Sequence, residues 1–168
     1  MVEKAKEQSG LDEDRLFEKH SGGIITYADV FISYSYRDDK IIPLALSLLL
    51  EKEGCKVYLP KLFSRKKGKT PTKLDIELTH SALSVSSSLV LVNGPETTRS
   101  QWIPWEIGFV AGKTGKVCVF DVGDDEKKPR NSEFLNLYPK IHPLESKIIV
   151  DNSKSIMDWV YDKDNLYK

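Results

Sequence analysis

The sequence has few cysteines and histidines, which argues against two common ways of stabilising or equipping a small protein. Only two cysteines, Cys55 and Cys118, occur in 168 residues. They lack C-x-x-C spacing, and each falls in or beside an apolar strand candidate, so we expect buried, reduced thiols. The three histidines, His20, His80 and His142, are too scattered to indicate a metal cluster, and we expect no metal.

Long apolar runs and an excess of charge of one sign are also missing. The longest apolar stretch, residues 41–50, falls well short of the roughly twenty residues that span a bilayer. The N-terminus alternates charges where a secretory signal has an apolar run. Lys plus Arg and Asp plus Glu both number 25, so no net field attracts nucleic acid or an anionic membrane. We therefore expect a cytoplasmic protein that binds neither nucleic acid nor a membrane.

Phosphate-binding and nucleophile motifs are absent as well. The chain has no G-x-G-x-x-G after its first strand candidate and no G-x-x-x-x-G-K-[ST], which argues against a standard dehydrogenase or a P-loop enzyme. It also has no G-x-S-x-G elbow, which lowers the odds of acyl transfer.

What the sequence does contain is a regular alternation of apolar runs and helical patterns. Five runs rich in Val, Ile, Leu, Phe and Tyr cover residues 28–34, 56–59, 88–92, 116–122 and 147–150. Their spacing of about thirty residues is typical of β-α-β units. Runs that are apolar on both faces favour a parallel sheet covered on both sides. We predict a flavodoxin-like, doubly wound α/β domain with a five-stranded parallel sheet over residues 27–168, preceded by a charged leader over residues 1–26 with at most a short helix.

Helical patterns fill the gaps between these runs. Asp38 and Asp39 precede a helix with apolar positions at i, i+3, i+4 and i+7, which Gly54 ends. A looser helix is predicted over residues 73–84 and a third over residues 101–112. In the third, we expect Ile103, Ile107 and Val110 to face the sheet, and Trp102 and Glu106, one turn apart, to share an adjacent face near its edge.

In open α/β sheets, ligands bind outside the carboxyl ends of the strands, where strand order reverses. Candidate residues after the first run are Tyr34, Ser35, Tyr36 and Arg37. Candidates in the basic loop after the second run are Lys61, Phe63 and Arg65. Taken singly, each feature has a more frequent explanation. The residues after the first run could simply begin a loop, and the basic loop could simply be solvated. Trp102 and Trp105 could serve only to pack the helix. A glutamate near a helix start commonly serves the helix dipole.

Together these residues resemble the Toll/interleukin-1 receptor (TIR) domain family, in particular its stand-alone bacterial members of anti-phage defence (Thoeris-like). The resemblance begins with Tyr-Ala-Asp-Val-Phe-Ile-Ser-Tyr-Ser at 27–35 and continues through Asp-Asp-Lys at 38–40. It extends to Glu-Gly-Cys-Lys-Val-Tyr at 53–58, Ile-Glu-Leu-Thr-His-Ser-Ala at 76–82 and Ser-Gln-Trp-Ile-Pro-Trp-Glu at 100–106. The chain departs from the family's usual patterns in the loop after the second strand and in the turn at Asn93-Gly-Pro.

Many family members cleave NAD+ at the nicotinamide–ribose bond with a glutamate in the helix after the third strand. Glu106 and Trp102 fall at the matching positions, so the resemblance implies that Glu106 is catalytic and that Trp102 packs on the nicotinamide–riboside end. Tyr34, Ser35, Tyr36 and Arg37 would line the entrance, Phe63 would complete the NAD+ site, and Lys61 or Arg65 would meet the pyrophosphate. NAD+ would be the substrate, with no other cofactor.

The resemblance leaves the product and the wider context open. Water would give ADP-ribose, and attack from within the same molecule would give a cyclic product that signals to a separate effector. Two other readings remain: a non-catalytic scaffold that works by TIR–TIR self-association, and a deoxyribosyltransferase-like nucleoside enzyme.

Overall fold

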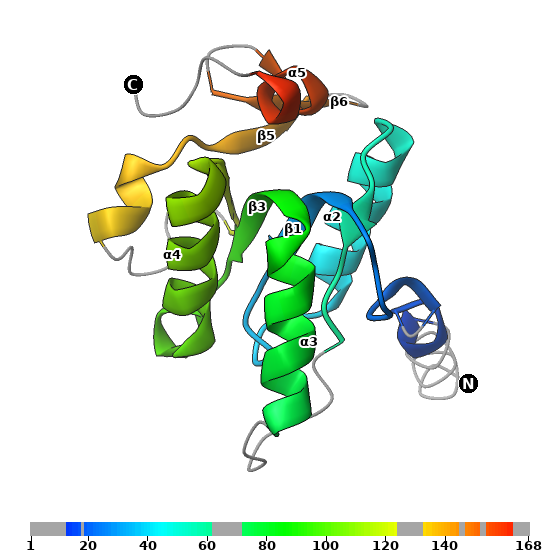
Figure 1. Ribbon diagram of the computed structural model, residues 1–168. Helices are drawn as coiled ribbons and strands as arrows, with labels where there is room; N and C mark the ends of the chain where they lie inside the picture. Colours follow the sequence, from blue (N-terminus) through cyan, green and yellow to red (C-terminus); the bar gives the residue numbers. More distant parts are fainter. Residues whose placement is uncertain are drawn as a thin grey trace.

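A four-stranded parallel sheet forms the centre of the computed structural model, which describes residues 13–17, 19–61, 72–123, 133–144, 147–151 and 154–162 (Figure 1). Its strands are β1 (Ala28–Ser33), β2 (Val57–Tyr58), β3 (Ser86–Asn93) and β4 (Val117–Asp121). Their spatial order is β2-β1-β3-β4, and every pairing is parallel. The chain therefore reverses its winding direction between β1 and β3, which is where a doubly wound sheet opens its binding crevice.

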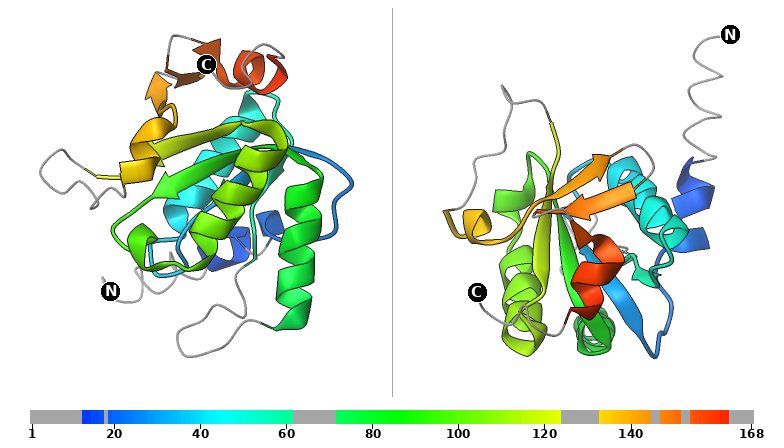
Figure 2. Two further views of the ribbon diagram at one scale, coloured as in Figure 1. Left: turned by 60° about the vertical axis from the view of Figure 1, so that its left-hand side comes forward. Right: turned by 90° about the horizontal axis from the view of Figure 1, so that it is seen from above.

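Helices cover both faces of this sheet, as the sequence predicts (Figures 1 and 2). Helices α3 (Lys73–Ser84) and α4 (Trp102–Thr114) lie on one face, and α2 (Ile41–Lys52) lies on the other with the short α5 (Ile156–Tyr161). Phe31 and Leu91 point to the α3/α4 face, whereas Val30, Ile32 and Val90 point to the α2 face. This two-sided burial explains why the strands read as continuous apolar runs.

The parallel sheet formed by the described residues has four strands, so the five-stranded prediction is corrected. The predicted fifth strand exists as β6 (Lys147–Val150), but it lies in an antiparallel sheet between β5 (Ile141–Leu144) and β7 (Lys154–Ser155). Beside β4, the chain makes one parallel bridge, from Val119 to Lys140, before it turns away into this sheet. Pro139 and Pro143 flank that bridge and have no N–H to extend a parallel ladder, which explains the short contact.

The ends of α2 follow the expected chemistry. The backbone N–H of Ile41 donates to Oδ1 of Asp39 at 3.0 Å, so Asp39 satisfies one of the donors left open at the helix start. Pro43 lies in the first turn, where a missing N–H costs nothing. Gly54 follows the helix with a φ of 96°, which a residue with a side chain rarely adopts.

The predicted buried thiols are confirmed. Cys55 and Cys118 are both free and buried, and burial raises the pKa of the Cys55 thiol to about 12. Neither sulfur is therefore a ready nucleophile at neutral pH. In the segment predicted as a leader, residues 13–17 and 19–20 are helical, and Phe17 packs edge-on against Tyr34 in the core. The domain boundary at residue 27 stays a prediction.

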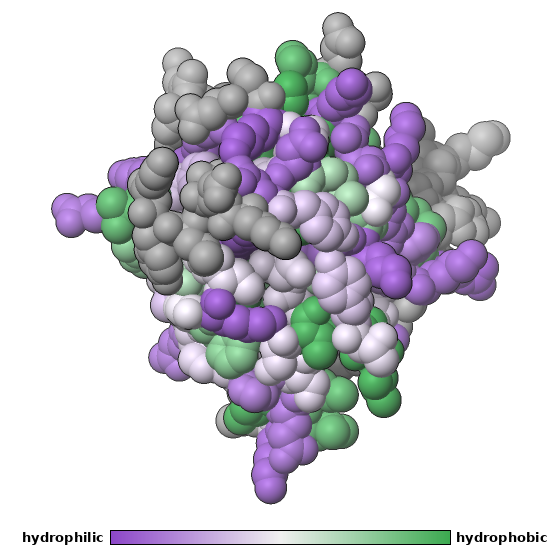
Figure 3. Space-filling view, turned by 45° about the horizontal axis from the view of Figure 1, so that its top comes forward, coloured by the Kyte–Doolittle hydropathy of each residue, from purple (hydrophilic) through white to green (hydrophobic). Residues whose placement is uncertain are grey.

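The surface mixes charged and apolar side chains. On the face shown in Figure 3, hydrophilic residues are interspersed with scattered hydrophobic ones. The exposed apolar residues of α3 include Leu74 at 62%, Ile76 at 43% and Leu78 at 41% exposure. Within the described part of the chain, no helix has the length and apolar character to cross a membrane.

Candidate functional site

The candidate site centres on a buried contact between β1 and α4. Ser33 is the last residue of β1, and its hydroxyl donates to Oε2 of Glu106 at 2.5 Å. Side chains alternate along a strand, so Ser33 shares the α3/α4 face with Phe31, two residues earlier. The contact therefore places a carboxylate at the carboxyl end of β1, beside the point where the sheet reverses direction.

Glu106 lies deeper than the sequence predicted. We expected Trp102 and Glu106 on one face at the rim, but Glu106 is 0% exposed and belongs to the buried face of α4 with Ile103, Ile107 and Val110. Positions 103, 106, 107 and 110 follow the i, i+3, i+4, i+7 spacing of a single helix face. The expectation that Glu106 lies exposed at the rim is therefore wrong. Its carboxylate does lie at the carboxyl edge of the sheet, beside Ser33.

Aromatic side chains form a row along the outer side of α4. The rings of Trp102 and Trp105 meet edge-on with centroids 5.7 Å apart, and Trp105 lies 6.3 Å from Phe109. Trp102 is half-buried and Trp105 is 37% exposed. Trp102, in the first turn of α4, therefore offers an aromatic surface one turn away from the buried acid.

The residues that follow β1 divide between the core and the surface. Tyr34 is 3% exposed, and its hydroxyl donates to the carbonyl of Pro60 at 2.9 Å. It points to the α2 face, so the prediction that it lines an entrance is wrong in this structure. Ser35 is also buried, and its Oγ accepts the N–H of Arg37 at 3.3 Å.

Tyr36 and Arg37 are the accessible members of this segment. The Arg37 guanidinium lies 5.2 Å from the centroid of the Tyr36 ring, and its Nε donates to the Tyr36 hydroxyl at 3.1 Å. Lys61, half-buried, directly follows the Pro60 carbonyl that Tyr34 binds. Phe63 and Arg65 lie outside the described residues, so their roles stay predictions.

A second polar contact links the loop after β1 to the turn after β3. Oδ1 of Asp38 accepts the N–H of Glu96 at 3.1 Å, and the Asp38 carboxylate packs against Gly94. Burial raises the pKa of Asp38, and the nearby Glu96 charge adds to this, against the opposing effect of the Glu96 hydrogen bond. Asp38 thus ties the loop after β1 to the turn after β3.

This contact makes a prediction about Gly94. A Cβ at this position would overlap the Asp38 carboxylate, so Gly94→Ala must displace either the turn or the Asp38 side chain. We expect Gly94→Ala to lower the free energy of unfolding by about 1–3 kcal/mol, measured by urea denaturation. Gly112→Ala in α4 is the matched control, because a Cβ there meets nothing within 4 Å. Equal stability of the two variants would contradict this account of Gly94.

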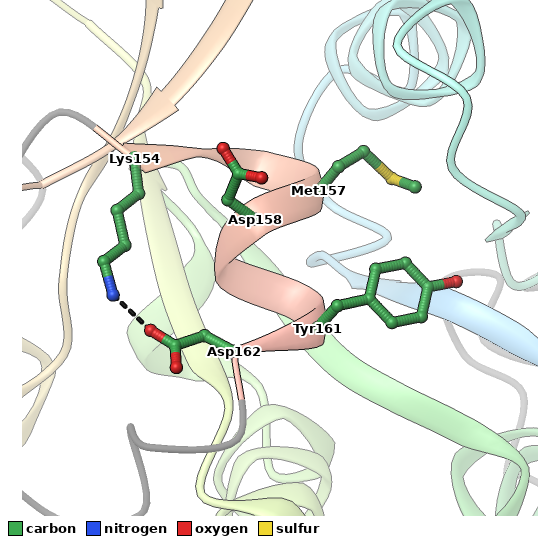
Figure 4. Close-up of a pocket in the computed structure, with 5 residues that line it drawn as sticks. All are labelled: Lys154, Met157, Asp158, Tyr161 and Asp162. Atoms are coloured by element: carbon green, nitrogen blue, oxygen red, sulfur yellow. Dashed lines mark hydrogen bonds and ion pairs between the residues drawn. The ribbon is translucent and has the colours of Figure 1, made fainter.

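An open pocket of about 530 Å³ lies elsewhere, along α5 (Figure 4). Lys154, which pairs with Asp162, and Met157, Asp158 and Tyr161 line it. The Tyr161 hydroxyl donates to Asp29 near the start of β1, about 13 Å along the strand from Ser33 at roughly 3.3 Å per residue. The pocket therefore belongs to the amino end of the sheet, opposite the candidate site.

Ser33 and Asp38 are the site residues that the sequence reasoning missed. The signal for Ser33 was present, because it lies two positions after Phe31 and ends a buried strand. Pairing it with Glu106 requires knowing that α4 packs over that end of β1, which the sequence does not state. Among the described residues, no group of three or more His, Cys, Asp or Glu side chains is arranged to hold a metal ion.

The fold and the site together define a doubly wound α/β domain with a buried acid at the switch point of its sheet. The family model for the TIR-like domain of Thoeris protein ThsB matches residues 31–127, which is more than half of the chain. The chain therefore belongs to the family of Thoeris ThsB proteins with a TIR-like domain.

Two known proteins illustrate the similarity. A Bacillus cereus (strain MSX-D12) protein described as "Probable 3' cyclic ADP-D-ribose synthase ThsB'" is 25% identical over 142 residues, covering 83% of this chain and 71% of its own. The solved TIR domain of the Toll-related receptor TRR-2 from Hydra magnipapillata is 19% identical, with a TM-score of 0.48. That match covers 67% of this chain and 83% of the Hydra domain.

Proposed function

We propose that this protein cleaves NAD+ at the bond between nicotinamide and ribose, with Glu106 as the catalytic residue. One observation carries the proposal: the Glu106 carboxylate accepts a hydrogen bond from Ser33 at the carboxyl end of β1, the edge at which doubly wound sheets bind ligands. Membership of the ThsB family and the description of the Bacillus relative as a cyclic ADP-D-ribose synthase support the same substrate class.

The chemistry suits a single carboxylate. When the C1′–N bond breaks, its electron pair leaves with nicotinamide, whose ring becomes neutral, and positive charge develops on the ribose. A carboxylate beside the ribose stabilises that charge, as in other oxocarbenium-like transition states. The leaving group needs no proton and the reaction needs no oxidant, so NAD+ serves as substrate and no further cofactor is required.

The accessible residues near this edge would form the binding surface. Trp102 would stack on the nicotinamide–riboside end, and the Tyr36–Arg37 pair and Lys61 would meet the pyrophosphate and outer ribose. Because Glu106 is 0% exposed, NAD+ reaches it only after side chains around the start of α4 move aside. The proposal therefore includes an opening step before chemistry, as in other enzymes that close over their substrates.

The product is proposed to be a cyclic ADP-ribose, by analogy with the Bacillus relative described as a probable 3' cyclic ADP-D-ribose synthase. In that reaction an atom of the same molecule, and not water, attacks C1′ and loses its proton to solvent. A released cyclic nucleotide would act as a signal for a separate effector in defence.

Incubation of the purified protein with NAD+ tests the proposal. We expect release of nicotinamide together with a product that is lighter than ADP-ribose by one water, measured by mass spectrometry. ADP-ribose as the sole product would retain the cleavage but replace cyclisation by hydrolysis. Absence of nicotinamide release at high protein concentration would contradict the proposed activity.

A scaffold function has one observation in its favour, the exposed apolar residues Leu74 and Leu78, which lie one turn apart on α3. Contiguous exposed apolar patches often mark association surfaces, although single exposed apolar residues are common. If the protein is a scaffold, Leu74→Glu lowers its sedimentation-derived mass while wild-type protein releases no nicotinamide. If it is an enzyme, nicotinamide release occurs whatever the effect on mass.

A further inference from the structure

We infer that Ser33 is a positioning residue of the proposed reaction, acting through Glu106. The inference rests on the proposed function and goes one step further, because it assigns a role to a hydroxyl that the sequence reasoning overlooked. The two side chains are both 0% exposed, and the Oγ–Oε2 distance is 2.5 Å. A hydroxyl that donates to a carboxylate at this distance makes a strong, charge-assisted hydrogen bond.

Ser33 is well placed to fix an orientation. Its backbone lies in an inner strand of the sheet and pairs with Leu91 of β3, so its hydroxyl has a fixed position at the carboxyl edge of the sheet. Glu106, by contrast, has three side-chain torsions and could point its carboxylate in several directions. A bond from the rigid strand to Oε2 selects one of them, and small errors in the placement of a catalytic group cost large factors in rate.

A simpler explanation is that Ser33 only satisfies its own buried hydroxyl. The chain offers a matched comparison in Ser88 on the neighbouring strand β3. Ser88 is also 0% exposed, and its hydroxyl donates to the backbone carbonyl of Asp29 at 2.6 Å, near the opposite end of the sheet. If both serines are only structural, their alanine variants should lose similar stability and neither should lose turnover specifically.

The test compares Ser33→Ala, Ser88→Ala and wild type by steady-state kinetics of nicotinamide release, with urea unfolding of each protein. We expect Ser33→Ala to lower kcat by about 10- to 100-fold with KM changed by less than about 2-fold. We expect Ser88→Ala to keep the wild-type kcat. Should Ser33→Ala not fold, Ser33→Cys replaces it, because the thiol keeps the size of the side chain but is a weak donor.

The outcomes separate the inference from the proposed function. A wild-type kcat in the Ser33 variant, alongside an active wild-type enzyme and an inactive Glu106→Gln, would overturn the role of Ser33 alone. An increase in kcat would also overturn it, because Ser33 would then hold Glu106 back. Equal losses of kcat in the Ser33 and Ser88 variants would also overturn it, because the effect of Ser33→Ala would then reflect a general loss of stability. No release of nicotinamide by wild-type protein would overturn the proposed function and this inference with it.

Discussion

Glu106→Gln is expected to lower the rate of nicotinamide release by about 100- to 1,000-fold while the protein stays folded. Glutamine has nearly the same shape as glutamate, and its amide oxygen can still accept the hydrogen bond that Ser33 gives to Oε2. The substitution removes the negative charge that would face the developing ribose cation. Steady-state release of nicotinamide measures the effect, and circular dichroism verifies the fold.

Glu77→Gln is the matched control for this variant. Glu77 lies on the exposed side of α3, and its Oε1 is 3.6 Å from Nζ of Lys73 one turn earlier. Glu77→Gln therefore makes the same chemical change at a position outside the site. We expect Glu77→Gln to keep the wild-type rate of nicotinamide release. The protein should stay folded, because exposed ion pairs contribute little to stability, and Glu77 lies outside the site. A Glu106→Gln protein with more than about a tenth of the wild-type rate would remove Glu106 from the catalytic role.

The sequence predicts the parallel sheet well because the strands are buried on both faces. Val30, Phe31 and Ile32 read as a continuous apolar run, and the structure shows why: Val30 and Ile32 contact one core and Phe31 the other. The same reasoning fails after β4. Residues 147–150 are apolar enough for a central strand, but the path of the chain through Pro139 and Pro143 decides which sheet they join.

The sequence predicts where in the fold the candidate site lies, but not how its side chains are oriented. The end of β1 and helix α4 do meet at the carboxyl edge, through Ser33 and Glu106. Helical spacing alone, however, allowed Glu106 to join either Trp102 or Ile103 and Ile107, since neighbouring faces of a helix differ by small rotations. Ser33 settles the choice, because a buried carboxylate needs a donor and β1 supplies one at its last residue.

Asp29→Ala is expected to lower the free energy of unfolding by about 2–3 kcal/mol. Asp29 is 2% exposed near the start of β1. Its Oδ1 accepts the hydroxyls of Tyr27 and, at 2.6 Å, Tyr161, and its Oδ2 accepts the N–H of Lys56 at 2.7 Å. One carboxylate thus joins β1 to α5 and to the segment before β2, and its removal leaves three donors without that acceptor.

The same contacts make this part of the stability depend on pH. Burial by itself would raise the pKa of Asp29, but the hydrogen bonds from Tyr161, Tyr27 and the Lys56 backbone, with the Lys56 charge, hold it below the ordinary value of 3.8. The unfolded chain therefore binds this proton more tightly than the folded chain. The stability that the carboxylate contributes is fully present above about pH 4 and is lost as the pH falls through the lowered pKa.

Urea unfolding of wild type and Asp29→Asn at a series of pH values measures this contribution. We expect the difference in free energy of unfolding to be constant near neutral pH and to shrink below about pH 4, because acid neutralises the wild-type carboxylate and leaves the amide unchanged. Tyr161→Phe, which removes one donor, should give a smaller difference with the same pH dependence. A difference that stays constant down to about pH 2 would show that the charge of Asp29 is not what joins α5 to the first strand.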